Sequence, residues 1–275
     1  MSIFRKLYNF THPLVGEIWC LHRVLPERSM FKSNRDLEIT PAYLEKLIQD
    51  KRSQGFRFVD MDTIVAVANG KQKGRRLAHV TFDDGFADVF ANAYPILKKH
   101  QIPFTLYVTT DMPDGKADLW WYQLETMVKG NAEWFEKVVG QVYARKEDVA
   151  ATMHEMTSSA CDPTLCQKLS LSWEQIREMV SEGLCTVGSH GVSHSALSLL
   201  SEEAIKHELV DSKQRLEAML GVEVKHFSYP HSFYTETTPE MVRAAGYNTM
   251  VIGYGGSVHR KKGNDFFYRK FIVQP

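Results

Sequence analysis

The sequence predicts an α/β protein with a mostly parallel sheet, either open or closed into a barrel. Two observations lead to this prediction: strand-like apolar runs recur along the chain, and stretches with helix start and stop signals lie between them. In both forms of sheet, functional sites gather at the carboxyl ends of the parallel strands. We therefore expect motifs that are distant in sequence to meet at one end of the sheet.

Seven runs have the apolar and β-branched composition of strands. They are Glu17–Val24, Leu77–Phe82, Phe104–Thr109, Leu184–Gly188, Val224–Tyr229, Asn248–Gly253 and Phe267–Val273.

Four intervening stretches carry helix signals. Thr40-Pro41 reads as an N-cap and first helical residue, and Gly55 ends that helix. A capping box at Ser172-Trp-Glu-Gln175 opens a helix through Ser181. Ser201 caps a long helix that runs to Leu220 and stops at Gly221, and Thr238-Pro239 begins a further helix that ends at Gly246.

The rhythm of strands and helices breaks between residues 111 and 169. This stretch begins with Asp114-Gly-Lys-Ala-Asp-Leu-Trp-Trp-Tyr122 and continues as polar, helix-prone sequence. It is short and shows no evident core of its own, so we interpret it as an insertion over the rim of a single domain. That domain spans residues 1–275, and its motif-bearing part spans residues 77–275.

Composition excludes several classes of function. Lys plus Arg equals Asp plus Glu at 33 each, so no net field favours nucleic acid or an anionic membrane. No apolar run approaches the roughly 20 residues of a membrane helix. The first residues, including Arg5 and Lys6, are not followed by an uninterrupted apolar stretch, so we expect no signal peptide and a cytoplasmic protein. The four cysteines, Cys161 among them, are interpreted as free thiols.

Two adjacent carboxylates, Asp83 and Asp84, end an apolar extended run and are followed by Gly85. Such a segment is often only an acidic turn, with glycine supplying a permissive backbone. Side chains that are neighbours at a strand end diverge, however, so one carboxylate can bind a metal while the other faces a substrate.

A pair of histidines, His190 and His194, follows another extended run. Histidines in loops are usually structural. A spacing of four places both rings on one face if the segment makes a helical turn. One carboxylate and two imidazoles suit a divalent metal, and the second carboxylate remains available as a base. Together the four residues predict metal-assisted hydrolysis.

Three segments now carry a family resemblance. Thr81-Phe-Asp-Asp-Gly85, Ser189-His-Gly-Val-Ser-His194 and Phe227-Ser-Tyr-Pro-His231 resemble the successive motifs of the polysaccharide deacetylase (NodB homology) family. The resemblance runs from Leu77 to the end of the chain. It implies a distorted (β/α) barrel of about seven strands that hydrolyses N- or O-acetyl groups on sugars.

The resemblance also implies roles for individual residues. Asp83 would be the general base, and Asp84, His190 and His194 would bind the metal, typically Zn2+ and sometimes Co2+ or Ni2+. The third motif would bring Tyr229, Pro230 and His231 to the site, with the backbone N–H of His231 donating to the developing oxyanion.

Two departures from the family pattern matter. Ser228 stands where many members have an arginine that orients the base, and Arg269 or Arg23 is a candidate replacement. The late Leu-x-His motif that supplies the general acid is absent, which leaves His22 and His259. We favour His22, because Leu21-His-Arg-Val24 resembles the opening strand of some branches and a strand end positions an acid better than a glycine-rich loop.

Trp120 and Trp121, with the nearby Asp118, have two interpretations. Aromatic residues commonly fill cores. Indole rings also stack on the apolar faces of sugars, and the insertion is expected to overhang the rim, so all three residues are candidate substrate contacts.

We therefore expect a metal-dependent hydrolase that removes N-acetyl groups from an acetamido sugar of a bacterial envelope polysaccharide or glycan precursor. One alternative is a deformylase or other amide hydrolase acting on a lipid-linked amino sugar, which would associate the protein with a membrane. The other is a carbohydrate-binding protein that has lost catalysis.

Overall fold

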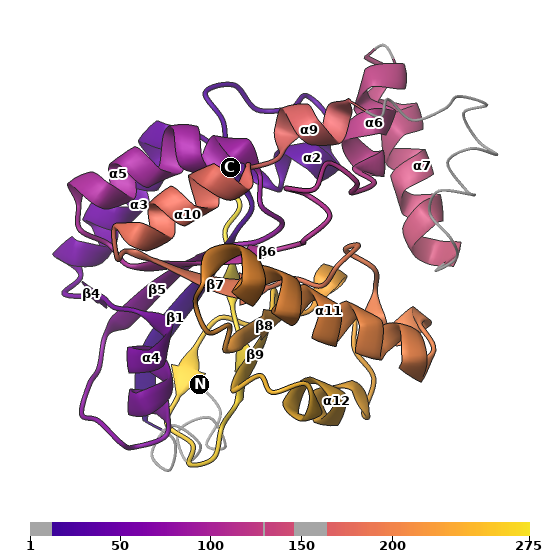
Figure 1. Ribbon diagram of the computed structural model, residues 1–275. Coiled ribbons are helices and arrows are strands. Elements are labelled where there is room, and N and C mark those ends of the chain that lie inside the picture. The colour runs from indigo at the N-terminus through magenta and orange to yellow at the C-terminus, as the bar shows by residue number, and fades with distance from the viewer. Residues whose placement is uncertain (1–12, 129, 146–163) are drawn as a thin grey trace, which may run out of the picture.

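The computed structural model describes residues 13–128, 130–145 and 164–275 (Figure 1). The segment behind the signal-peptide prediction, residues 1–12, and Cys161 lie outside the described residues. Cys20, Cys166 and Cys185 are free and buried.

A nearly closed barrel of parallel strands forms the centre of the molecule (Figure 1). Its strands pair in the order β1-β5-β6-β7-β8-β9-β11, and β12 pairs with β1 to complete the ring. The strands are β1 (Leu14–Leu21), β5 (Leu77–Phe82), β6 (Phe104–Val108), β7 (Cys185–Ser189), β8 (His226–Ser228), β9 (Thr249–Ile252), β11 (Phe266–Tyr268) and β12 (Lys270–Phe271). The predicted distorted (β/α) barrel is confirmed. It has seven parallel strands if β11 and β12 are counted as one interrupted strand.

Short strands complete the sheets. β10 (Val258–His259) pairs antiparallel with β1, and β4 (Arg57–Phe58) pairs parallel with β5. β2 (Arg23–Val24) and β3 (Glu38–Ile39) form a separate parallel pair.

Two predicted strands differ from the structure at places that matter for the site. The predicted strand Glu17–Val24 begins earlier and stops at Leu21, where the Leu21 carbonyl accepts from the Asp83 N–H at 2.9 Å. The predicted strand Phe267–Val273 is interrupted at Arg269. The chain changes partner there: the Arg269 N–H bonds to Ile252 of β9, and the N–H of Ile272 bonds to Cys20 of β1.

The helices largely follow their predicted caps. Thr40 accepts from the Tyr43 N–H, Ser172 and Gln175 form the capping box, and Gly221 ends its helix at φ 67°. The helix at Thr238-Pro239 begins at Thr238 itself, and its N-cap is Thr237. The helical elements are α2 (Lys32–Arg35), α3 (Pro41–Ser53), α4 (Met61–Ala68), η1 (Val89–Ala93), α5 (Tyr94–Lys99), α6 (Trp120–Met127), α7 (Ala132–Arg145), α9 (Leu165–Leu169), α10 (Trp173–Ser181), η2 (Leu197–Leu199), α11 (Glu202–Leu220), η3 (Pro230–Ser232) and α12 (Thr238–Ala244).

Most of the core lies between the barrel and its helices. Helices α3, α5 and α10 group on one side, and α11 and α12 lie together on another (Figure 1). The outward side chains of the strands, such as Val80, Phe82 and Leu106, are fully buried in this layer. Because each parallel strand is followed by a crossover, every motif at a strand end faces the same rim.

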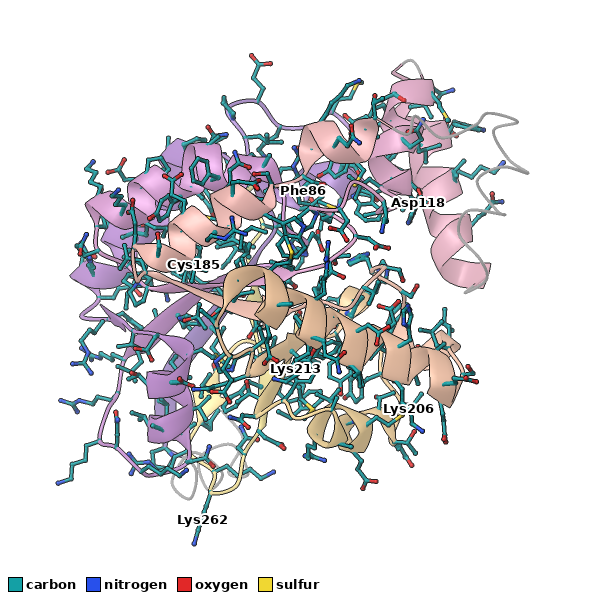
Figure 2. All side chains as sticks on the ribbon, viewed as in Figure 1. Phe86, Asp118, Cys185, Lys206, Lys213 and Lys262 are labelled. Atoms are coloured by element: carbon teal, nitrogen blue, oxygen red, sulfur yellow. The ribbon has the colours of Figure 1, made fainter. Side chains whose placement is uncertain are left out.

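The insertion projects from that rim as α6, α7 and α9 (Figure 1). The sequence shows no evident core in this stretch, but the structure gives it a second hydrophobic cluster that includes Trp120, Leu124 and Phe135. Phe31 and Phe86, from outside the insertion, complete the cluster, and Phe86 lies where the insertion meets the barrel (Figure 2). Among the described residues, no helix is both long and apolar enough to cross a membrane.

Candidate active site

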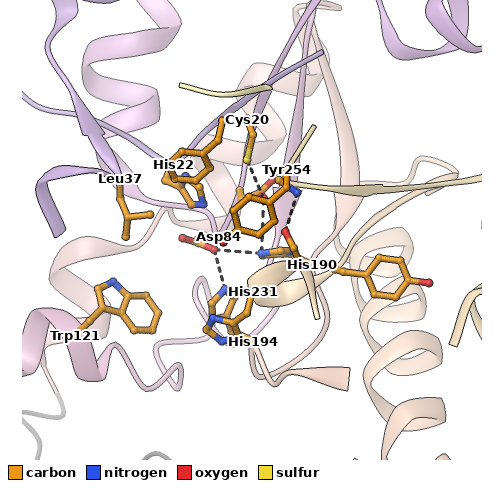
Figure 3. A pocket seen from close by; sticks show the side chains of 14 residues that line it. Cys20, His22, Leu37, Asp84, Trp121, His190, His194, His231 and Tyr254 are labelled. Carbon is orange, nitrogen blue, oxygen red and sulfur yellow. Dashed lines mark hydrogen bonds and ion pairs between the residues drawn. The ribbon is translucent and has the colours of Figure 1, made fainter. Parts of the chain in front are cut away.

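A pocket with a volume of about 140 Å³ opens at the carboxyl ends of the barrel strands (Figure 3). Its lining joins segments from along almost the whole chain. The lining residues used below are Cys20, His22, Asp83, Asp84, Trp121, His190, His194, Tyr229, His231 and Tyr254.

Asp84, His190 and His194 converge on one point of this pocket. The Oδ1 atom of Asp84 lies 3.4 Å from Nε2 of His190 and 3.2 Å from Nε2 of His194. That Oδ1 atom is buried and has no hydrogen-bond partner among the described residues. A buried carboxylate oxygen without a partner is costly, and a cation held by all three side chains removes the cost. The residues present therefore fit a divalent metal with one oxygen and two nitrogen ligands.

The backbone brings these ligands together in an unusual conformation. His190 and His194 do not share a helical turn, as the spacing of four suggested; residues 190–194 form a loop, and the two ring centroids lie 5.0 Å apart. Asp84 and His194 both have positive φ, 76° and 65°. Non-glycine residues adopt this region at a cost that the surrounding structure must offset, and such residues cluster at functional sites.

Hydrogen bonds to β8 and α11 hold the histidine loop in place. Nδ1 of His190 donates to the Ser228 carbonyl at 2.7 Å, which turns Nε2 and its lone pair toward Asp84. The carboxylate of Glu208, on α11, accepts from the N–H groups of Val192 and Ser193 at 2.6 and 3.2 Å. Gly191 has a φ of 81°, which side chains other than glycine rarely adopt, and a Cβ atom there would also lie 2.6 Å from Oε2 of Glu208. Nothing in the sequence distinguishes Glu208 from the other charged residues of its helix.

Asp83 is paired with a buried arginine from the interrupted last strand. Arg269 donates to both oxygens of Asp83 at 2.6 Å, and Ser228 donates to Oδ2 at 3.2 Å. Burial alone would raise the pKa of Asp83, but the Arg269 guanidinium, together with the nearby imidazoles of His190 and His22, lowers it to about 2. Asp83 is therefore ionised at neutral pH. Arg23, the other candidate partner, instead bonds to Asp88 at 2.8 Å.

His22 and Cys20 reach the pocket from the end of β1. Their polar side-chain atoms and an oxygen of Asp83 all lie within 4.8 Å of one another. Burial lowers the pKa of His22, and burial raises the pKa of the Cys20 thiol well above its ordinary value. Cys20 was not among the predicted site residues. Its place in the lining follows from that of His22, because residues two apart on an extended chain share a face.

His259 lies at the other end of the barrel. It pairs with Leu14 at the start of β1, whereas the pocket lies beyond Leu21. Seven residues of strand separate these ends by about 23 Å. The structure therefore does not bring His259 to the pocket, because the segment that carries it is a short strand rather than a loop over the rim.

The third motif contributes two residues to the lining. His231 has a φ of 55°, and its ring lies 4.4 Å from that of His194. Burial, reinforced by the charge of His194, lowers the pKa of His231 to about 3. Tyr229 is buried against the pocket wall, and Pro230 is buried at the start of η3. Donation by the His231 backbone N–H to an oxyanion stays a prediction.

The insertion brings one of its three candidate residues into the lining. Trp121 lines the pocket with its ring 5.5 Å from that of His194 (Figure 3). Its indole Nε1 is buried and has no hydrogen-bond partner within the described parts of the chain. Trp120 packs edge-on against Trp121 in the second cluster, and Asp118 is exposed beside the insertion helices (Figure 2). Neither residue is in the lining of the pocket as described.

Comparisons with known proteins agree with this geometry. A model of the polysaccharide deacetylase family matches residues 70–250. The Bacillus subtilis (strain 168) protein YxkH, named as a candidate polysaccharide deacetylase, is 23% identical over 193 residues, which cover 70% of this chain. The chain spans only half the length of that relative.

Three solved structures are similar in fold. IcaB from Ammonifex degensii superposes with a TM-score of 0.67 and 24% identity over 94% of this chain and 92% of its own. The deacetylase PplD of Streptococcus pyogenes gives 0.66 and 21% over 94% and 92%. A de-N-acetylase from Aggregatibacter actinomycetemcomitans gives 0.69 and 15% over 94% and 95%.

Proposed function

Because the chain belongs to the polysaccharide deacetylase family, we propose that it is a metal-dependent hydrolase that removes N-acetyl groups from an acetamido sugar of a bacterial polysaccharide or glycan precursor. The observation that carries this proposal is the pairing of an ionised base, Asp83, with a three-residue metal cradle in one pocket.

Asp84, His190 and His194 would hold the metal, with Zn2+ as the first candidate and Co2+ or Ni2+ as alternatives. When bound, the metal supplies Lewis-acid chemistry that polarises the acyl carbonyl and the attacking water.

The chain's own residues would move the protons. Asp83, held in its ionised form by Arg269, removes the proton of the water that attacks the acyl carbon. His22 donates a proton to the leaving amine nitrogen as the carbon–nitrogen bond breaks. Its position beside Asp83 supports this role, because the carboxylates of Asp84 and Asp83 favour the protonated imidazole and oppose burial, which lowers its pKa.

The size of the pocket supports an acyl group as the buried part of the substrate. Clefts that enclose a whole small-molecule ligand have volumes of about 300–1,000 Å³. This pocket, at about 140 Å³, admits the acyl end while the sugar ring stays at the rim. The indole N–H of Trp121 is a donor for an oxygen of the substrate there.

The Arg269 contact also bears on the alternative of a degenerate binding protein. That alternative arose partly because Ser228 replaces the motif arginine. Here a guanidinium reaches Asp83 from β11–β12 and donates to the hydroxyl of Ser228 at 2.9 Å. Arg269 therefore supplies, from another strand, the positive charge beside the base that the motif arginine supplies in other members.

Acyl release from a panel of N-acetyl, N-formyl and O-acetyl sugars, with and without added Zn2+, tests the proposal. We expect metal-dependent release of acetate from N-acetyl sugars. Release of formate alone would identify a deformylase, and sugar binding without any release would identify a binding protein.

A further inference from the structure

A second set of potential metal ligands lies beside the first in the pocket. Cys20, His22 and Asp83 place a thiol sulfur, an imidazole nitrogen and a carboxylate oxygen within 4.8 Å of one another. This set shares no residue with the cradle of the first metal. Figure 3 shows Cys20 and His22 together on one side of Asp84, with His194 on the other. Thiolate, imidazole and carboxylate are all ligands of Zn2+ in proteins.

The spacing of the second set suits a single zinc ion. The Sγ atom of Cys20 lies 3.7 Å from Oδ2 of Asp83. Zn2+ binds sulfur at about 2.3 Å and carboxylate oxygen at about 2.0–2.2 Å, so tetrahedral geometry places two such ligand atoms about 3.6 Å apart. The strand end and the carboxylate loop therefore already hold these two atoms at the separation that one ion requires.

His22 has nitrogen atoms available for this ion. None of the hydrogen bonds formed within the described residues involves a ring nitrogen of His22, whose ring packs against Phe271 with centroids 5.3 Å apart. Nδ1 of His190, by contrast, is fixed by the Ser228 carbonyl. The His22 ring can therefore turn toward an ion that lies between Cys20 and the base.

The surroundings of Asp83 leave room for an ion at Oδ2. Each carboxylate oxygen has two acceptor positions, and Arg269 occupies one on Oδ2. The other is shared by the thiol of Cys20 and the hydroxyl of Ser228, at 3.7 and 3.2 Å. Tyr254, which is 63% exposed, lines the same pocket, so an ion can enter from solvent.

We propose that Cys20, His22 and Asp83 form a second, inhibitory Zn2+ site that fills when zinc is in excess. Binding replaces the S–H bond of Cys20 by an S–Zn bond and releases the thiol proton to solvent. The ion then occupies the proposed base and the proposed acid, so neither can move a proton. Arg269 and the first ion are nearby positive charges, so the second ion should bind more weakly than the first. The inhibition rests on the proposed function, whereas binding of the second ion does not.

Cobalt spectroscopy tests the site without any turnover. A thiolate bound to Co2+ gives an intense charge-transfer band in the near ultraviolet, and the first set of ligands contains no thiol. We expect the band when a second equivalent of Co2+ is added to metal-free wild type. Cys20→Ala should lose the band, whereas Cys185→Ala, which removes a different buried thiol, should keep it.

The variant His190→Ala excludes a simpler arrangement, in which Cys20 is a further ligand of the first ion. This variant breaks only the first set, so the band should remain. A band that is complete at one equivalent in the wild type and is lost in His190→Ala would overturn the proposal.

Zinc inhibition of acetate release tests the consequence. The rate of each variant is expressed relative to its own rate with one zinc per chain. The zinc concentration that halves this rate should rise at least about tenfold in Cys20→Ala, because losing a direct ligand costs at least as much affinity as losing a partner of one. It should not change in Cys185→Ala. Equal inhibition in the wild type and Cys20→Ala, or activation by excess zinc, overturns the proposal.

Zinc content after dialysis against excess Zn2+ separates this proposal from the proposed function. Two zinc ions per chain in the wild type and one in Cys20→Ala, without turnover of any acylated sugar, would keep the second site and reject the deacetylase. Turnover with one zinc per chain at every zinc concentration would do the reverse.

Discussion

Arg269 and Asp83 form a buried ion pair whose disruption should have a large and measurable cost. Two hydrogen bonds of 2.6 Å join them, and their side chains are only 1% and 4% exposed. Arg269→Met keeps the length of the side chain and removes its charge, which leaves the Asp83 carboxylate buried without a cationic partner. Removing one member of a buried pair costs about 3–5 kcal/mol. This is a large share of the roughly 5–15 kcal/mol by which domains are stable.

A double-mutant cycle isolates the charge effect from lost packing. Combined with Asp83→Asn, the same Arg269→Met change no longer strands a carboxylate, so we expect the double variant to be more stable than Arg269→Met alone by at least about 1.5 kcal/mol. Urea unfolding at neutral pH, followed by circular dichroism, gives the free energy of unfolding for all four corners of the cycle. A loss below about 1 kcal/mol in Arg269→Met, or strictly additive effects, would refute the reasoning.

Three further predictions concern residues around the site and in the barrel interior. Glu208→Gln should weaken Zn2+ binding about 10- to 100-fold in a chelator competition, because an amide cannot accept all the hydrogen bonds that the histidine loop donates to this carboxylate. Glu203→Gln, an exposed change on the same helix, is the control. Equal zinc affinities in the two variants would contradict the role of Glu208. Trp121→Phe should lower kcat/KM about 3- to 10-fold, since it removes a buried N–H that has no partner among the described residues. An unchanged kcat/KM would argue against substrate contact. Burial lowers the pKa of His79 to about 4 in the folded protein. Between pH 6.5 and 4 the imidazole is therefore protonated in the unfolded chain but not in the folded one, and the free energy of unfolding falls as the pH drops through this range. His79→Leu should reduce the loss of unfolding free energy between pH 7 and pH 5 by about 2 kcal/mol, and an undiminished loss would contradict it.

The sequence was sufficient for the barrel and for the convergence of the motifs. Parallel strands with crossovers put Asp83, Asp84, His190 and His194 at one rim whatever the details of packing. The family order of the motifs then suggested which carboxylate binds metal. These inferences depend on local runs and spacings, which a sequence displays directly.

Other features of the site depend on long-range packing that spacing does not reveal. The approach of Arg269 to Asp83 requires the last strand to change partners from β9 to β1, and nothing in the local sequence marks that change. Glu208 reads as one of many charges on a helix, and only its contact with the loop at residues 192–193 distinguishes it. His259 shows the opposite case: nearby glycines suggested a loop over the rim, but residue 259 pairs with the far end of β1.

The central claim assigns proton removal to Asp83 and metal binding to Asp84, His190 and His194. Bound zinc and acetate release measured together on Asp83→Asn, beside His190→Ala, test this division most directly. We predict that Asp83→Asn keeps its zinc and loses acetate release, whereas His190→Ala loses both. Acetate release by Asp83→Asn near the wild-type rate would contradict the account.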